Sequence, residues 1–158
     1  MAKRANLYLA KAGQAAAMAE FLARGWNVAV PEVDVGDDLF IVRDDNGEFS
    51  RIQVKTASGQ QRNYGYSALF RVPLEQLQNI FTPELIYVFA VRYLQQWASF
   101  TLIPRPALDE CYQLHEIGNL ADNALILTFQ YKKTSLICSG QDLSTYINNW
   151  SQFPVIEN

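Results

Sequence analysis

The sequence predicts a single α/β domain, and three observations support this class. Apolar residues at helical spacing near the N-terminus come before a series of short strand patterns. Residues 85–93 form an almost continuous apolar run, which is typical of a strand buried on both faces. A chain of 158 residues, 49% of them hydrophobic, can bury one core of ordinary size, and it contains no internal repeat or linker.

The first half of the chain predicts a helix, a short strand and a β-hairpin. The alanine-rich residues 13–24 favour a helix, and Gly25 is suited to end it because glycine readily adopts positive φ. Residues 26–30 predict a short strand that ends before Pro31. Two further strands, at 38–43 and 49–56, flank an Asp-Asp-Asn-Gly sequence that is typical of a tight hairpin turn.

The rest of the chain predicts more strands and two more helices. The polar residues 57–66 contain glycine and indicate a loop, and Pro73 suits the first turn of a helix. The elements expected after that loop are a helix at 73–81, strands at 85–93, 97–103 and 124–131, and a final helix at 142–150. Ser139 or Asp142 could cap the final helix.

The distribution of charge and the absence of targeting signals limit the functions and locations that we expect. The net charge of −3 counts against a nucleic-acid binder, because phosphate contacts need lysine and arginine. The distribution favours DNA locally, since residues 50–74 contain four cations and no acid. The four are Arg51, Lys55, Arg62 and Arg71. We read no signal peptide and no membrane span, and we interpret the two isolated cysteines as buried thiols, so we expect a cytoplasmic protein.

Several kinds of active site are excluded by their missing motifs. The sequence contains no GxxxxGK[ST] phosphate loop, no GxGxxG dinucleotide motif and no GxSxG nucleophile elbow. His115 is the only histidine, and neither cysteine belongs to a CxxC pair, so a zinc site is not expected.

The remaining candidate chemistry lies at one end of the predicted hairpin. Asp38 begins its first strand, while Gln53 and Lys55 lie near the end of the returning strand. The period of two places Gln53 and Lys55 on the same face, and antiparallel pairing brings Asp38 beside them. A carboxylate and an amide oxygen are hard ligands that suit Mg²⁺, and a neighbouring lysine can orient water or stabilise developing negative charge.

These residues resemble the D…(D/E/Q)xK motif of the PD-(D/E)XK nuclease superfamily. The Gln-Val-Lys-Thr ending is similar to its glutamine-bearing branch, which includes small cyanobacterial group I intron homing endonucleases. The resemblance covers about residues 10–95, with 96–158 as a C-terminal extension. It implies a core of helix, hairpin, helix and strand, and hydrolysis of DNA phosphodiester bonds with Mg²⁺ or Mn²⁺. The residues it implies for catalysis are Asp38, Gln53, Lys55 and Gln14, and for the metal Asp38, Gln53 and Val54.

One position departs from the family pattern. The glutamate of the family's helix corresponds to Gln14, counted back from Gly25, and Glu20 lies further along the same helix. Asp34 and Asp37 could assist Asp38. The resemblance also implies DNA as partner, contacted by Arg51, Arg62 and Arg71, and a homo-oligomer that supplies two active sites. The alternatives are a degraded nuclease fold that binds DNA or protein, and an unrelated protein-interaction domain.

Overall fold

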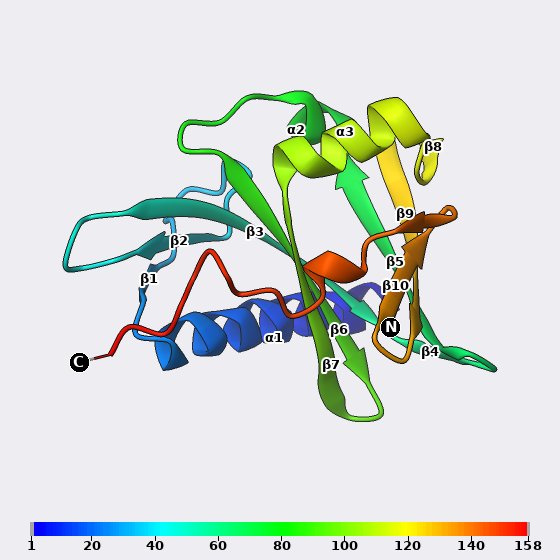
Figure 1. Ribbon diagram of the computed structural model, residues 1–158, viewed down its shortest axis with the longest axis horizontal. Helices are drawn as coiled ribbons and strands as arrows, with labels where there is room; N and C mark the ends of the chain where they lie inside the picture. Colours follow the sequence, from blue (N-terminus) through cyan, green and yellow to red (C-terminus); the bar gives the residue numbers. More distant parts are fainter. Residues whose placement is uncertain (1, 158) are drawn as a thin grey trace.

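A computed structural model describes residues 2–157, which form one α/β domain built from two β-sheets and three α-helices (Figure 1). The elements are α1 (Ala2–Ala23), β1 (Asn27–Ala29), β2 (Leu39–Val42), β3 (Phe49–Ser58), β4 (Gln60–Arg62), β5 (Gly65–Pro73), α2 (Leu74–Gln78), β6 (Leu85–Tyr93), β7 (Gln96–Pro104), α3 (Arg105–His115), β8 (Asn119–Ala121), β9 (Ala124–Lys132), β10 (Ser135–Cys138), β11 (Gln141–Asp142) and the 3-10 turn η1 (Ser144–Tyr146).

The first sheet is mixed and has the strand order β1-β2-β3-β6-β7. Strand β2 pairs antiparallel with β3, β3 pairs parallel with β6, and β6 pairs antiparallel with β7. The β2–β3 ladder ends where Leu39 faces Ile52, whereas β3 continues to Ser58. The edge of β3 beyond Ile52 is therefore not covered by β2.

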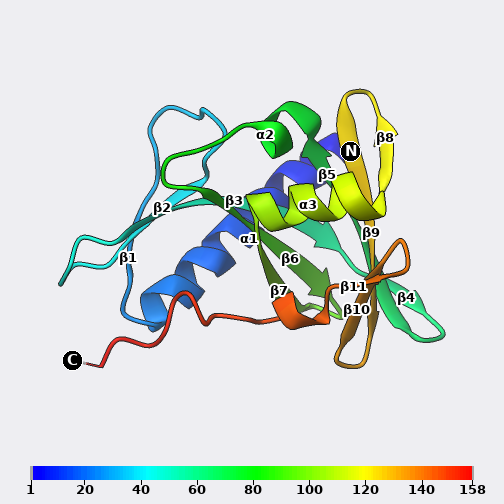
Figure 2. The ribbon, with the colours of Figure 1, turned by 45° about the horizontal axis from the view of Figure 1, so that its top comes forward.

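The second sheet is antiparallel and has the order β11-β10-β9-β5-β4, with β8 also paired to β9. It packs on one face of the first sheet, and α1 packs on the other, as two views of the ribbon show (Figures 1 and 2). Alternation along β6 separates the two cores. Ile86, Val88 and Ala90 join the α1 core, while Tyr87 and Phe89 join the core of the second sheet.

The end of α1 follows the glycine signal in the sequence. Gly25 has φ 86°, its N–H donates to the carbonyl of Leu22 at 2.9 Å, and the N–H of Trp26 donates to that of Phe21 at 3.1 Å. These two bonds are a Schellman motif. The helix begins at Ala2 rather than at residue 13, so its N-terminal half extends past the hairpin end that carries Asp38.

Several sequence expectations are confirmed and others are wrong. The strands expected at 26–30, 38–43, 49–56, 85–93, 97–103 and 124–131 are present. The loop expected at 57–66 is wrong, because these residues carry the end of β3, all of β4 and the start of β5. The helix expected at 142–150 is also wrong, since only the short 3-10 turn η1 forms there. The C-terminal half instead contains α3, which was not expected.

Two further expectations concern cysteines and membranes. Cys138 is buried as expected, whereas Cys111 on α3 is only partly buried. Within residues 2–157, no helix is long and apolar enough to cross a membrane.

Candidate active site

A groove of about 730 Å³ opens along the uncovered edge of β3. Its walls come from the N-terminal half of α1, from β4 and β5, and from the end of β3 itself. The structure brings Gln14, Asp38, Gln53, Val54 and Lys55 to this one groove. Asp38 reaches it because the chain turns into β2 at this point, where its N–H donates to the carbonyl of Ile52 at 2.8 Å.

The Asp38 carboxylate is fixed by two donors from β3. Its Oδ2 accepts hydrogen bonds from the side-chain Nε2 of Gln53 at 2.5 Å and from the backbone N–H of Val54 at 2.8 Å. The Asp38 carboxylate thus accepts the Val54 N–H that a longer β2 would bind with a backbone carbonyl. Successive strand residues turn their backbone groups to opposite edges, so the Val54 carbonyl lies on the same edge as its N–H.

Lys55 lowers the pKa of Asp38 and Asp38 raises the pKa of Lys55, but burial has the larger effect on the pKa of each group. Burial raises the pKa of Asp38, against the lowering effects of the Val54 N–H and the Lys55 ammonium. Burial lowers the pKa of Lys55, against the raising effects of Asp38 and Asp34. Each charged form is thus disfavoured by desolvation and partly restored by the other group. Such opposed, half-buried pairs are common at functional sites.

Gln14 borders the groove because α1 approaches β3 very closely at the preceding residue. A Cβ added to Gly13 would lie 2.6 Å from Cγ2 and 2.8 Å from Cβ of Thr56, so only glycine fits this contact. The Nε2 of Gln14 donates to the backbone carbonyl of Asp38 at 3.2 Å, and its Oε1 accepts from Lys11 Nζ at 3.1 Å. Gln14 therefore contacts the backbone of Asp38 rather than its carboxylate. Glu20, on the same helix, does not line the groove.

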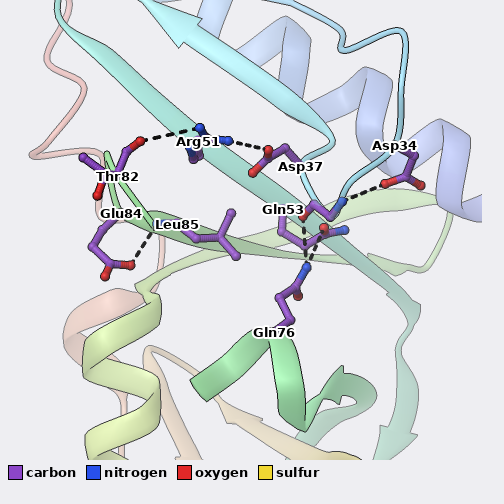
Figure 3. A network of polar contacts seen from close by, with 9 residues as sticks. Asp34, Asp37, Arg51, Gln53, Gln76, Thr82, Glu84 and Leu85 are labelled. Atoms are coloured by element: carbon purple, nitrogen blue, oxygen red, sulfur yellow. Dashed lines mark hydrogen bonds and ion pairs between the residues drawn. The ribbon is translucent and has the colours of Figure 1, made fainter. Parts of the chain in front are cut away.

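A second glutamine, which sequence reasoning missed, orients the first. Gln76 on α2 points toward Gln53, as Figure 3 shows, and its Nε2 donates to Gln53 Oε1 at 3.2 Å and to the Gly36 carbonyl at 3.0 Å. The Gln53 amide is thereby held between Gln76 and Asp38. A lone glutamine on a short helix carries no sequence signal for this role, because the contact spans from α2 to β3.

The three arginines expected at DNA lie in different places. Arg62 and Arg71 line the groove, together with Lys11, which the sequence analysis did not assign to a site. Arg51 lies outside it: its Nη1 is 2.7 Å from Oδ2 of Asp37, whose side chain is 1% exposed (Figure 3). Asp37 is thus bound in an ion pair whose carboxylate is buried and whose guanidinium is partly exposed, and Asp34 accepts from the N–H of Gly36 at 3.0 Å. Of the described residues lining the groove, Asp38 is the only acid.

The donor set is compatible with a hard divalent cation, but it carries little negative charge. The Asp38 carboxylate and the Val54 carbonyl offer oxygen to the groove. Gln53 could add its amide oxygen after rotating about its last side-chain bond, which would give up its present bonds to Asp38 and Gln76. Oxygen and nitrogen of such an amide exchange places on rotation. Among residues 2–157, no group of three or more His, Cys, Asp or Glu side chains is placed to hold a metal. A cation here would keep several water ligands.

Among solved structures, the fold is similar to that of a bacterial homing endonuclease, I-Ssp6803I. The TM-score is 0.55 and the sequence identity 19%, over 91% of this chain and 87% of that chain. At this identity the likeness establishes a shared fold. No protein-family model matches the sequence, and no curated protein sequence matches it.

Proposed function

We propose that this protein is a metal-dependent endodeoxyribonuclease of the PD-(D/E)XK type, with its site at Asp38, Gln53 and Lys55. The observation that carries the proposal is the pairing of the half-buried Asp38 carboxylate and Lys55 ammonium at one end of the hairpin. The other charged residues that line the same groove are all basic. A fold similar to that of a bacterial homing endonuclease supports it.

The chain's residues would divide the chemistry among them. A bound Mg²⁺ or Mn²⁺ would neutralise phosphate charge and activate a water molecule. Asp38, the Val54 carbonyl and the rotated Gln53 amide would hold the cation. Lys55 would donate to the phosphate oxygen on which negative charge develops, and its partly desolvated ammonium makes that interaction stronger than it would be in water.

The groove's other cations would bind the DNA backbone. Lys11, Arg62 and Arg71 border the groove on three different elements, and phosphate contacts of this kind position a duplex without reading its sequence. A homo-oligomer would supply two such sites, one for each strand, by symmetry. Sedimentation of the protein with and without DNA tests this expectation.

A second candidate is a DNA-binding module that has lost cleavage. It is favoured by Gln14, a neutral residue at the position where the family resemblance expects an acid, which leaves Asp38 as the groove's single carboxylate. Fewer anionic ligands weaken the binding of Mg²⁺, which gives up its water reluctantly.

Calorimetric titration with Mg²⁺ and Mn²⁺ separates the two candidates. We expect weak binding to the parent protein, tighter for Mn²⁺, loss of binding in Asp38→Asn, and tighter binding in Gln14→Glu because a charged ligand is added. Gln96→Glu, which adds the same charge at an exposed position of β7, is the matched control and should leave metal binding unaltered. Failure of the parent to bind either ion at millimolar concentration, with no gain in Gln14→Glu, would favour the binding module.

A further inference from the structure

The β4–β5 hairpin extends away from the rest of the molecule in both ribbon views (Figures 1 and 2). Its ladder pairs Gln60 with Ser67 and Arg62 with Gly65, so the turn contains only Asn63 and Tyr64. Four consecutive side chains at this tip, from Gln60 to Asn63, are exposed. Three of them are amides and the fourth is a guanidinium, so the tip presents hydrogen-bonding groups and no aliphatic side chain.

The neighbouring β9–β10 turn adds positive charge beside this tip. The Nζ of Lys132 lies 5.3 Å from the centre of the Tyr64 ring, and Lys133 follows it in the turn. Both lysines are exposed. Strands β3, β4, β5, β9 and β10 contain no aspartate or glutamate at all. The strands around this tip therefore carry lysine and arginine but no acid of their own.

The same hairpin continues into the groove of the candidate site. Gln60 and Arg62 line that groove, and Arg62 is held across the hairpin by bonds to Ser67 Oγ and Gln60 Oε1, both at 2.9 Å. Gln61 and Asn63 make no side-chain hydrogen bond with the described residues. Their amides are thus free to bind a partner, while Arg62 is already oriented.

We propose that the β4–β5 tip reads base sequence in the major groove of the duplex that the candidate site would cut. A two-stranded β-ribbon fits the major groove of B-form DNA, where asparagine or glutamine recognises adenine through paired hydrogen bonds. Lys132 and Lys133 bind the flanking phosphates and fix the register. This inference rests on the proposed function for its choice of DNA. It assigns Gln61 and Asn63 to specificity, separate from Asp38 and Lys55 and from Arg62, which faces the groove.

Selection of bound sequences from a duplex library with a randomised centre tests the assignment. The parent protein should enrich a short motif. The double variant Gln61→Ala/Asn63→Ala should lose discrimination at one to three adjacent positions by roughly 5- to 150-fold each, the range expected when a paired base contact is removed. Lys132→Ala/Lys133→Ala should weaken binding to all sequences and lower the slope of log K against log salt by up to about 2. Gln113→Ala, an exposed amide on α3, is the control.

The outcomes separate this inference from the proposed function. A parent that enriches a motif altered by the tip variants, yet cuts no DNA with Mg²⁺ or Mn²⁺, upholds the reading of sequence while the nuclease proposal fails. Enrichment of the same motif by the parent and by Gln61→Ala/Asn63→Ala overturns the inference, whether or not the protein cuts DNA. Absence of any enriched motif, or equal binding of duplex RNA, whose deep major groove excludes side chains, overturns it as well.

Discussion

Gly13→Ala tests the close packing that brings Gln14 to the groove. In a helix interior, alanine is normally favoured over glycine by about 1 kcal/mol. Here the new Cβ would lie 2.6 Å from Cγ2 and 2.8 Å from Cβ of Thr56, and closer still to Oγ1. Thr56 is β-branched and its backbone is paired to β6, so it cannot move far.

The two effects oppose each other, and the steric one should win. Overpacking a well-packed contact costs typically about 1–3 kcal/mol. Contacts this short place Gly13→Ala near the upper end of that range. Subtracting the helix gain leaves a net destabilisation of about 2 kcal/mol. The displaced α1 should also move Gln14 away from the Asp38 backbone, to which it now donates at 3.2 Å.

Urea unfolding of the variant and two controls measures this directly. Ala12→Gly, on the exposed side of α1, calibrates the helix propensity alone and should cost about 1 kcal/mol. Thr56→Ala removes two of the three atoms that meet the new Cβ, so combining it with Gly13→Ala should recover part of the loss. If Gly13→Ala instead stabilises the protein by about 1 kcal/mol, α1 does not lie against β3 as described.

Three other perturbations have defined outcomes. Arg51→Ala leaves the buried Asp37 carboxylate without its partner and should cost about 1–3 kcal/mol in urea unfolding; a loss well below about 1 kcal/mol would contradict the ion pair. Hydrogen bonds from Arg105 lower the pKa of Glu84 in the folded protein. Their contribution to folding stability is therefore fully present above the unfolded pKa of about 4.3, and it is lost as pH falls through the lower folded pKa. Glu84→Gln should therefore reduce the fall of the melting temperature as pH decreases below about 4.3. An unaltered dependence of the melting temperature on acidic pH would refute the coupling. Gln76→Ala removes an amide that donates at 3.0 and 3.2 Å, and should cost about 1 kcal/mol per bond in thermal unfolding, whereas a neutral result would argue against the network.

The elements that the sequence predicted correctly are those whose burial produces a recognisable pattern of apolar residues along the chain. β6 is buried along most of its length and reads as a continuous apolar run, while Ile52 and Val54 alternate with the polar side chains of β3. The hairpin turn followed from Gly47, which has φ 71°. The neighbourhood of Asp38, Gln53 and Lys55 followed from the same pairing logic, because it needed only strand alternation and one turn.

The elements that were missed depend on partners distant in the chain. β4 is an edge strand with exposed side chains, so its polar sequence resembles a loop. α3 begins with Pro106 in its first turn, where no backbone N–H is needed, yet a proline pair in sequence indicates a break. Near the C-terminus, Trp150 and Phe153 pack edge-on against Phe21 of α1, and this tertiary contact replaces the expected helix.

Strand scission of duplex DNA tests the central claim most directly. The parent protein, Asp38→Asn and Lys55→Ala would be incubated with supercoiled plasmid and Mg²⁺ or Mn²⁺, beside Asp45→Asn, which removes a charge at the opposite end of the same hairpin. We predict nicking and linearisation by the parent and by Asp45→Asn, and loss of both activities in Asp38→Asn and Lys55→Ala with DNA binding by Lys55→Ala retained in part. Intact plasmid with the parent in either metal, or equal cleavage by all four proteins, would contradict a nuclease site at Asp38 and Lys55.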